Sequence, residues 1–423
     1  MGNTDSTTKE EQRILSQPQT GEASEFYWAC RNGNIEKVKQ LLPTISYEDL
    51  NRLESNGSTP LHAASYSGQV EIVRLLLHKR GCRRDRLNRH GLSAYEEAFS
   101  DDIRQLFHRP AGRNRFCDED EGEQEDVEKM FQVTVKEDEK EEEEDDDSEE
   151  LFEDKWLQQR ATSKEIENAK IFLGTATRLT GSKLVRLLLA DFDKDFSQGK
   201  LKEDLNEMLA EHVTDENPEY DKCRALVTKA FAENRPEHLL RLYSLETGFY
   251  RALADDVEPL ITPLYILLEK LKPRYFQGVS YRGVKMTAED LRSYRWALKK
   301  KGAIQTQTFC STSLDRSVAE RFAGTTNMND EKQSVLMIFN FAEKCDTAIN
   351  LNKLSNELPC LSEYENEKEV LVFPATLFYV THIEEGTNCM TIYLKNIAVP
   401  KIGLFRALKR VYDTEKWTND RIY

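Results

Sequence analysis

Three short polar motifs follow one another in the last third of the chain, and each combines residue types that can take part in chemistry. They are Tyr281-Arg282-Gly283, Ser311-Thr312-Ser313 and Glu367-Lys368-Glu369. The first joins an arginine to a glycine, the second offers hydroxyl groups, and the third offers two carboxylates two positions apart. Each motif is short enough to arise by chance, so the argument depends on the ordered set.

The side chains of these motifs can bind an anionic group and stabilise positive charge. The guanidinium of Arg282 can bind phosphate oxygens in a bidentate manner, which a lysine cannot do. Gly283 lacks a side chain and lets the backbone approach a ligand closely. When a glycosidic bond breaks, positive charge develops on the sugar, and a carboxylate of the third motif can stabilise it.

The surrounding sequence predicts the elements that must position these motifs. Apolar spacing of three and four residues predicts helices over 166–178, 182–189, 222–233 and 238–252. Short β-rich runs predict strands over 279–282, 334–341, 369–373, 376–384 and 390–394. The serine motif follows the apolar Phe309 and is predicted at a strand edge. Helices first and strands later predict an α+β domain over residues 155–400.

The ordered motifs resemble the Arg-Ser-Glu signature of ADP-ribosyltransferases, in particular the arginine-specific mono-ADP-ribosyltransferases of animals. Residues 242–251 resemble the helix that precedes the Tyr-Arg-Gly strand in that family, and residues 388–395 resemble its last strand. The resemblance covers about residues 160–400. It implies an ADP-ribosyltransferase fold, with a helical lobe followed by a split β-sandwich core. It also implies NAD, or NADP, as the substrate and no metal.

The resemblance assigns a role to each residue of the site. The residues it implies for NAD binding are Tyr281, Arg282, Gly283, Ser311, Ser313 and Phe322. Ser311 would orient the catalytic glutamate or the nicotinamide ribose. Phe322, eleven positions later, would stack on the nicotinamide, although a core position on a helix would also explain it.

The third motif supplies the catalytic glutamates Glu367 and Glu369. We assign Glu369 to the ribose because it directly precedes an apolar strand, and Glu367 to the acceptor, because a glutamate at this position implies arginine as acceptor. On an extended segment the two side chains would share one side. Tyr364 is the aromatic expected to recognise the acceptor. Because Glu365 and Glu367 form a second pair with the same spacing, a register shifted by two residues stays open.

A repeat of 34–35 residues precedes this domain and predicts an α-solenoid over residues 22–111. The stretch 56–64 resembles the start of an ankyrin repeat, in which Thr59 can cap a helix and Pro60 can occupy its first turn. Similar copies begin near residues 26 and 90. Ankyrin repeats imply a protein ligand. A basic cluster in this block is interpreted as a solvated loop; it consists of Lys79, Arg80, Arg83, Arg84, Arg86 and Arg89.

The acidity of the chain is confined to one segment. Of the net charge of −16, residues 117–154 carry −19, from 22 acidic residues and three lysines, which leaves the remainder near +3. Such dense like charge predicts a disordered linker over residues 112–154 that keeps the two domains apart. Disorder is also predicted for residues 1–21, and residues 401–423 form a C-terminal tail.

The composition and the terminal sequences indicate the compartment of the protein and the kinds of binding site that it is expected to contain. Eight cysteines without a secretion signal predict reduced thiols in a cytoplasmic protein, and their spacing does not predict a metal site. The N-terminal residues fit the pattern for myristoylation at Gly2, which is the one membrane attachment that the sequence predicts. The second domain lacks the array of basic and aromatic residues expected of a nucleic-acid binder.

Two further functions stay open beside transfer of ADP-ribose to protein arginines. One is NAD glycohydrolysis, in which water replaces the acceptor. The other is a catalytically inactive adaptor that binds NAD and uses its ankyrin repeats to bind partners. Loss of Arg282, Ser311 or both glutamates would have favoured the adaptor, and all of these residues are present.

Overall fold

A computed structural model describes residues 3–18, 23–109, 131–134, 198–299, 303–324, 332–374, 376–386 and 389–398. The chain forms two compact units. The first consists of residues 1–113, 205–251 and 352–366, and the second of residues 114–204, 252–351 and 367–423. The boundary therefore does not separate the repeats from the predicted catalytic domain. Helices and one loop of that domain belong with the repeats.

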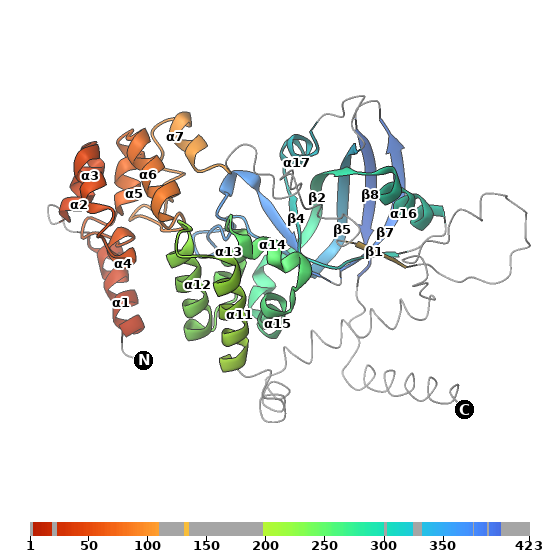
Figure 1. The fold of residues 1–423 in the computed structure, drawn as a ribbon, viewed down its shortest axis with the longest axis horizontal. Helices are drawn as coiled ribbons and strands as arrows, with labels where there is room; N and C mark the ends of the chain where they lie inside the picture. The colour runs from red at the N-terminus through yellow and green to blue at the C-terminus, as the bar shows by residue number, and fades with distance from the viewer. Residues whose placement is uncertain are drawn as a thin grey trace, which may run out of the picture. The chain divides into compact units, whose positions relative to one another are not determined.

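The first unit begins with a series of short helices (Figure 1). They are α1 (Asn3–Ser16), α2 (Glu25–Arg31), α3 (Ile35–Leu41), α4 (Tyr47–Leu50), α5 (Pro60–Tyr66), α6 (Val70–Arg80) and α7 (Asp101–Leu106). Thr59 caps α5 by accepting a hydrogen bond from the His62 amide, and Pro60 occupies the first turn. Buried apolar side chains from these helices, such as Leu61 and Leu76, form one core.

Helix α1 corrects the prediction that the N-terminus is disordered. Residues 3–16 are helical, and Glu11 binds the guanidinium of Arg86 with a hydrogen bond of 3.1 Å. Glu11 of this polar helix thus pairs with a charged residue outside the helix, which the composition of the helix does not reveal. Gly2 lies outside the described residues, so its modification stays a prediction.

Helices α12 (Tyr220–Glu233) and α13 (Glu237–Ser244) also belong to the first unit, as do α11 (Gln198–His212) from residue 205 onwards and α14 (Gly248–Asp255) up to residue 251. The helix predicted over 238–252 is divided in two, because Leu245 is extended and ends α13. A Cβ at Gly248 would lie 2.4 Å from the His212 carbonyl oxygen, so a glycine is needed at the start of α14. The helices predicted over 166–178 and 182–189 fall outside the described residues.

The second unit contains an eight-stranded sheet in the order β1-β3-β7-β8-β5-β2-β4-β6 (Figure 1). The strands are β1 (Phe131–Thr134), β2 (Tyr275–Met286), β3 (Ala303–Thr306), β4 (Cys310–Ser313), β5 (Gln333–Asn350), β6 (Glu369–Val372), β7 (Leu377–Glu385) and β8 (Met390–Asn396). Strand β5 also pairs with β6, so β2, β4, β6 and β5 form a closed ring of strands. Each of the five predicted strands overlaps an observed one.

Strand β1 corrects one part of the predicted linker. Residues 131–134 lie within the acidic segment, yet they pair antiparallel with β3, with Phe131 opposite Thr306. Their sequence, Phe-Gln-Val-Thr, contains no charge and favours a strand. The disorder predicted for 112–154 is therefore wrong for these four residues, and the rest of that segment lies outside the described residues.

The described residues of the second unit also include helical elements that flank the strands. They are α15 (Glu258–Ile266), the 3-10 helix η3 (Leu268–Arg274), α16 (Ala288–Lys299) and α17 (Arg316–Ala323). Helix α17 packs on β2, and α16 packs against β7. Within the described parts of the chain, no helix combines the length and apolar character needed to cross a bilayer.

Candidate active site

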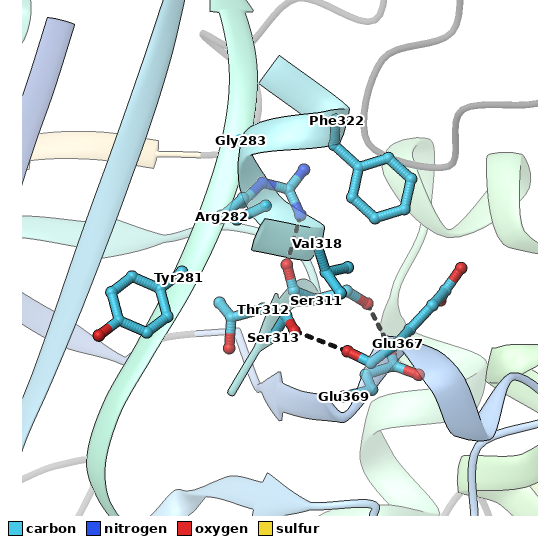
Figure 2. Close-up of a pocket in the computed structure, with 11 residues that line it drawn as sticks. Tyr281, Arg282, Gly283, Ser311, Thr312, Ser313, Val318, Phe322, Glu367 and Glu369 are labelled. Carbon is cyan, nitrogen blue, oxygen red and sulfur yellow. Dashed lines mark hydrogen bonds between the residues drawn. The ribbon is translucent and has the colours of Figure 1, made fainter. Parts of the chain in front are cut away.

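The three sequence motifs meet in one pocket of the second unit, with about 250 Å³ of empty space that includes its opening to solvent. Figure 2 shows the pocket between β2, β4, α17 and the start of β6. Its lining residues are Tyr281, Arg282, Gly283, Ser311, Thr312, Ser313, Val318, Ala319, Phe322, Glu367 and Glu369. The pocket thus contains all the predicted site residues except Tyr364.

Strand pairing explains why the motifs converge. Strand β4 lies between β2 and β6, with Ser313 opposite Tyr281 on one side and opposite Glu369 on the other. Ser311 pairs with Leu371. Strand β4 therefore brings together two motifs that lie nearly ninety positions apart in the sequence, because its backbone is hydrogen-bonded to both neighbouring strands.

Ser311 contacts both the arginine and the catalytic glutamate. Its hydroxyl donates to Oε1 of Glu369 at 2.6 Å, and its backbone oxygen accepts from Nη1 of Arg282 at 2.8 Å (Figure 2). Ser311 is fully buried, and the exposed fractions of Arg282 and Glu369 are both 2%. One residue thereby fixes the direction of a carboxylate and of a guanidinium.

Glu367 reaches the pocket by a route that the sequence did not predict. Residues 365–367 form a 3-10 turn, η4 (Glu365–Glu367), and Lys368 has a φ of +48°. The segment is not extended as expected, because β6 begins only at Glu369, but both glutamates still face the same pocket. The turn is held by the Ser313 hydroxyl, which donates to the backbone oxygen of Glu367 at 2.7 Å.

The contacts also distinguish the two possible glutamate registers. Glu369 is the residue that accepts the hydrogen bond from the Ser311 hydroxyl. Glu365 is absent from the pocket lining and belongs to the first unit, where burial raises its pKa and a hydrogen bond from Ser93 opposes that rise. The geometry therefore favours Glu369 and Glu367 over the shifted pair.

Gly283 is needed for a different reason from the one predicted. A Cβ there would lie 1.8 Å from the Ala319 carbonyl oxygen and 2.5 Å from the Ala323 amide nitrogen. The missing side chain lets α17 lie directly on β2, and close approach to a ligand is not needed to explain it. This packing brings Val318 and Phe322 to the pocket.

The two aromatic residues of the pocket lie differently. Phe322 projects from α17 over the pocket in Figure 2 and is half-buried. The ring of Tyr281 lies on the other side of β2 from Phe322. Neighbouring side chains of a strand alternate between its two faces, so Tyr281 and Arg282 are expected to point to opposite sides of β2. Stacking of Phe322 on nicotinamide stays a prediction, and the Tyr281 ring is poorly placed to share that task.

Tyr364 is enclosed within the first unit. The Tyr364 ring lies 5.0 Å from the guanidinium carbon of Arg84 and 4.0 Å from that of Arg109. Burial raises the pKa of its hydroxyl. The ring is buried beside two arginines, and its role in acceptor recognition stays a prediction.

Sequence reasoning missed Thr312, Val318 and Ala319 as pocket residues. The hydroxyl of Thr312 donates to the Val370 backbone oxygen at 2.8 Å and forms a hydrogen bond of 2.9 Å with the Ser280 hydroxyl, which ties together three neighbouring strands. Val318 and Phe322 are four positions apart, so the helical period could have revealed the first from the second. Among the described residues, no three His, Cys, Asp or Glu side chains form a group that could hold a metal ion.

Comparison with known proteins identifies the repeats. Residues 14–95 match the family model of ankyrin repeats in three copies, so the first unit contains ankyrin repeats. Myotrophin from Xenopus tropicalis is 40% identical over 55 residues, 13% of this chain and 45% of the relative. Inversin from Danio rerio is 35% identical over 68 residues, 16% of this chain and 7% of the relative. The chain spans less than half the length of these curated relatives.

The similar solved structures include ADP-ribosyltransferases. The Vis toxin from Vibrio splendidus is 20% identical, with a TM-score of 0.24, over 51% of this chain and 87% of that chain. HopU1 of Pseudomonas syringae is 13% identical, with a TM-score of 0.34, over 48% and 98%. Exoenzyme S from Pseudomonas aeruginosa is 15% identical, with a TM-score of 0.31, over 50% and 96%. Because these likenesses are distant, the function proposed below is argued from the pocket residues.

Proposed function

We propose that this chain transfers ADP-ribose from NAD to arginine side chains of acceptor proteins and releases nicotinamide. The observation that carries the proposal is the hydrogen bond from Ser311 to Glu369, beside Arg282 and Glu367 in one pocket. Such a hydroxyl fixes the carboxylate where positive charge would develop on the ribose. Preorganised groups of this kind supply much of the rate enhancement of enzymes.

The pocket residues fit NAD as the substrate. Arg282 supplies a guanidinium whose orientation is fixed by the Ser311 carbonyl, which suits a phosphate oxygen or a ribose hydroxyl of the dinucleotide. Phe322 offers an aromatic face for the nicotinamide ring. Because these residues are the ones assigned to the nicotinamide and its ribose, we expect the pocket to hold that end of the dinucleotide.

The reaction breaks the bond between nicotinamide nitrogen and ribose C1′, and the bonding electrons leave with nicotinamide. Glu369 stabilises the oxocarbenium-like ribose through its negative charge. A guanidinium nitrogen of the acceptor then bonds to C1′, and Glu367 takes the proton that this nitrogen loses. The ankyrin repeats would bring acceptor or partner proteins to the enzyme.

The test is to incubate the full chain with labelled NAD and agmatine, a small guanidine. The proposal expects ADP-ribosyl-agmatine and nicotinamide in equal amounts. Putrescine, which carries amines in place of the guanidine, serves as the matched control and should give no adduct. Nicotinamide without adduct would support the glycohydrolase instead, and binding of NAD without either product would support the inactive adaptor.

A further inference from the structure

The segment 352–366 belongs to the same compact unit as the ankyrin repeats. It ends at Asn366, and the next residue is Glu367, the proposed acceptor-side glutamate of the pocket. The chain therefore runs directly from this segment into the turn that carries Glu367.

Glu363 lies at the centre of a cluster of buried charges. Its Oε2 accepts from Lys222 Nζ at 3.1 Å, and its Oε1 accepts from Arg241 Nη1 at 3.1 Å. Arg84 of the ankyrin block donates from Nη1 to the Glu363 backbone oxygen at 3.4 Å, and its Nε lies 3.9 Å from Oε2. The Glu363 amide donates to Ser244 Oγ at 3.0 Å. Both the side chain and the backbone of Glu363 are thus fixed.

Asp85 extends this cluster into the ankyrin block. Its carboxylate accepts from Nε and Nη2 of Arg83 at 2.9 and 2.7 Å, and it lies 3.5 Å from Nε of Arg241. Arg241 therefore lies between the two carboxylates of Asp85 and Glu363. It also donates to the backbone oxygen of Cys360 at 2.6 Å, which adds a second attachment to the segment.

The segment has a third attachment at its other end. Lys353 Nζ donates to Glu96 Oε1 at 2.6 Å and to the Gly91 backbone oxygen at 3.2 Å. Both partners belong to the last ankyrin repeat. The segment is thus bound to the repeats near its beginning, through Lys353, and near its end, through Glu363.

Burial makes it energetically unfavourable for the groups of this cluster to stay charged. Burial opposes ionisation of Glu363, but Lys222 and Arg241 outweigh it and hold its pKa below the ordinary value of 4.5. Buried ion pairs contribute little net stability compared with apolar residues of similar size, while loss of one partner is strongly destabilising. Such a cluster is therefore better explained by the geometry that it imposes than by stability.

We propose that Glu363 is a positioning residue for Glu367, and that the ankyrin block, through Arg84, Asp85 and Glu96, supplies part of that positioning. This inference rests on the proposed function for its effect on catalysis. It gives the repeats a task beyond recruitment, because they order the segment that leads into the acceptor side of the pocket. Ser311, Arg282 and Glu369 do not depend on this segment, since strand pairing holds them.

The experiment compares full-length Glu363→Gln and Lys353→Gln with a control, Lys37→Gln. Lys37 forms an ion pair of 2.9 Å with Glu25 in the first ankyrin repeat, and its side chain is 31% exposed, against 27% for Lys353. Three quantities are measured for each variant. They are kcat for agmatine transfer, kcat for NAD hydrolysis without acceptor, and amide hydrogen exchange of residues 352–367.

Glu363→Gln should lower transfer by about 10-fold or more, because misplacement of a reacting group by about 1 Å can cost 10²-fold. Hydrolysis and the KM for NAD should stay near the wild-type values, and exchange of the segment should become faster. Lys353→Gln should show the same pattern to a smaller extent. It leaves the buried charges intact, so it provides the test if Glu363→Gln fails to fold.

Two results would overturn the inference. Transfer and hydrolysis that fall in parallel would mean that the cluster only stabilises the fold. Variants that match Lys37→Gln in transfer and exchange would mean that the attachments do not position the segment. If the wild type forms neither product, the proposed function fails, and faster exchange in Glu363→Gln alone decides whether the cluster orders residues 352–367.

Discussion

The pocket and the cluster around Glu363 both bury carboxylates, but they hold them with different partners. In the pocket, a neutral hydroxyl of Ser311 donates to Glu369. In the cluster, the cations Lys222 and Arg241 donate to Glu363. A hydroxyl fixes the direction of a carboxylate without cancelling its charge, whereas two cations neutralise it. The first arrangement suits a group that must act on a ligand, and the second suits a group that must hold a loop.

The largest expected effect concerns Glu369. Glu369→Gln should lower both transfer and NAD hydrolysis by about 10²–10³-fold or more, because both reactions need the charge that stabilises the ribose. Nicotinamide release with and without agmatine measures the two reactions, and Glu365→Gln is the control from the alternative register. If Glu369→Gln retains hydrolysis and Glu367→Gln loses it, the catalytic pair is Glu365 and Glu367.

The next effect separates the two glutamates of the pocket. Glu367→Gln should lower the rate of agmatine transfer by about 10²–10⁴-fold, which is the usual contribution of a general base, while NAD hydrolysis continues. The same two assays measure it. Equal loss of both reactions would show that Glu367 takes part in cleavage of NAD and is not confined to the acceptor.

Gly283→Ala should destabilise the second unit. The new Cβ would meet the Ala319 backbone, which cannot move without displacing α17, and such overpacking costs about 1–3 kcal/mol. Urea unfolding measures the change, with Val279→Ala as control, because Val279 is an exposed residue of the same strand. Equal stability of the two variants would show that α17 has room to move.

Acid should weaken the cluster around Glu363. Burial opposes ionisation of Asp85, yet Arg241 and Arg83 hold its pKa well below the ordinary value of 3.8, and that of Glu363 is held below 4.5. A carboxyl whose pKa is lowered by folding stabilises the fold above its unfolded pKa, and this stabilisation is lost as the pH falls through the folded pKa.

Wild type should therefore lose stability from about pH 4.5 downwards, and Glu363→Gln should lose less over the same range. Urea midpoints between pH 3 and 7 measure this difference. An identical pH dependence in both proteins would contradict the lowered pKa of Glu363.

The smallest effect concerns an exposed ion pair. Arg295 and Glu385 lie 2.7 Å apart, but their side chains are 50% and 70% exposed. Arg295→Gln should change stability by less than about 1 kcal/mol, because solvent screens the pair. A change in urea midpoint as large as that of Glu363→Gln would contradict the expectation that an exposed ion pair contributes less to stability than a buried one.

The sequence predicted features whose signals are local. The cap at Thr59, the ankyrin repeats and the strands that contain the motifs all follow from neighbouring residues. The interpretation of the basic cluster as a solvated loop was wrong for Arg84, because it also relied on neighbouring residues alone. Arg84 was predicted to be solvated, but it is buried and contacts Glu363, 279 positions away, which local patterns cannot reveal.

The chain by itself therefore determined which chemical groups are present and in which order, because hydroxyl, guanidinium and carboxylate are fixed by residue type. Only the tertiary structure decided which of them meet. Pairing of β4 with β6 brings Ser311 to Glu369, and the left-handed Lys368 turns Glu367 into the pocket. Burial likewise decided that Glu363 holds a loop, because a carboxylate away from water needs cations that only the folded chain brings to it.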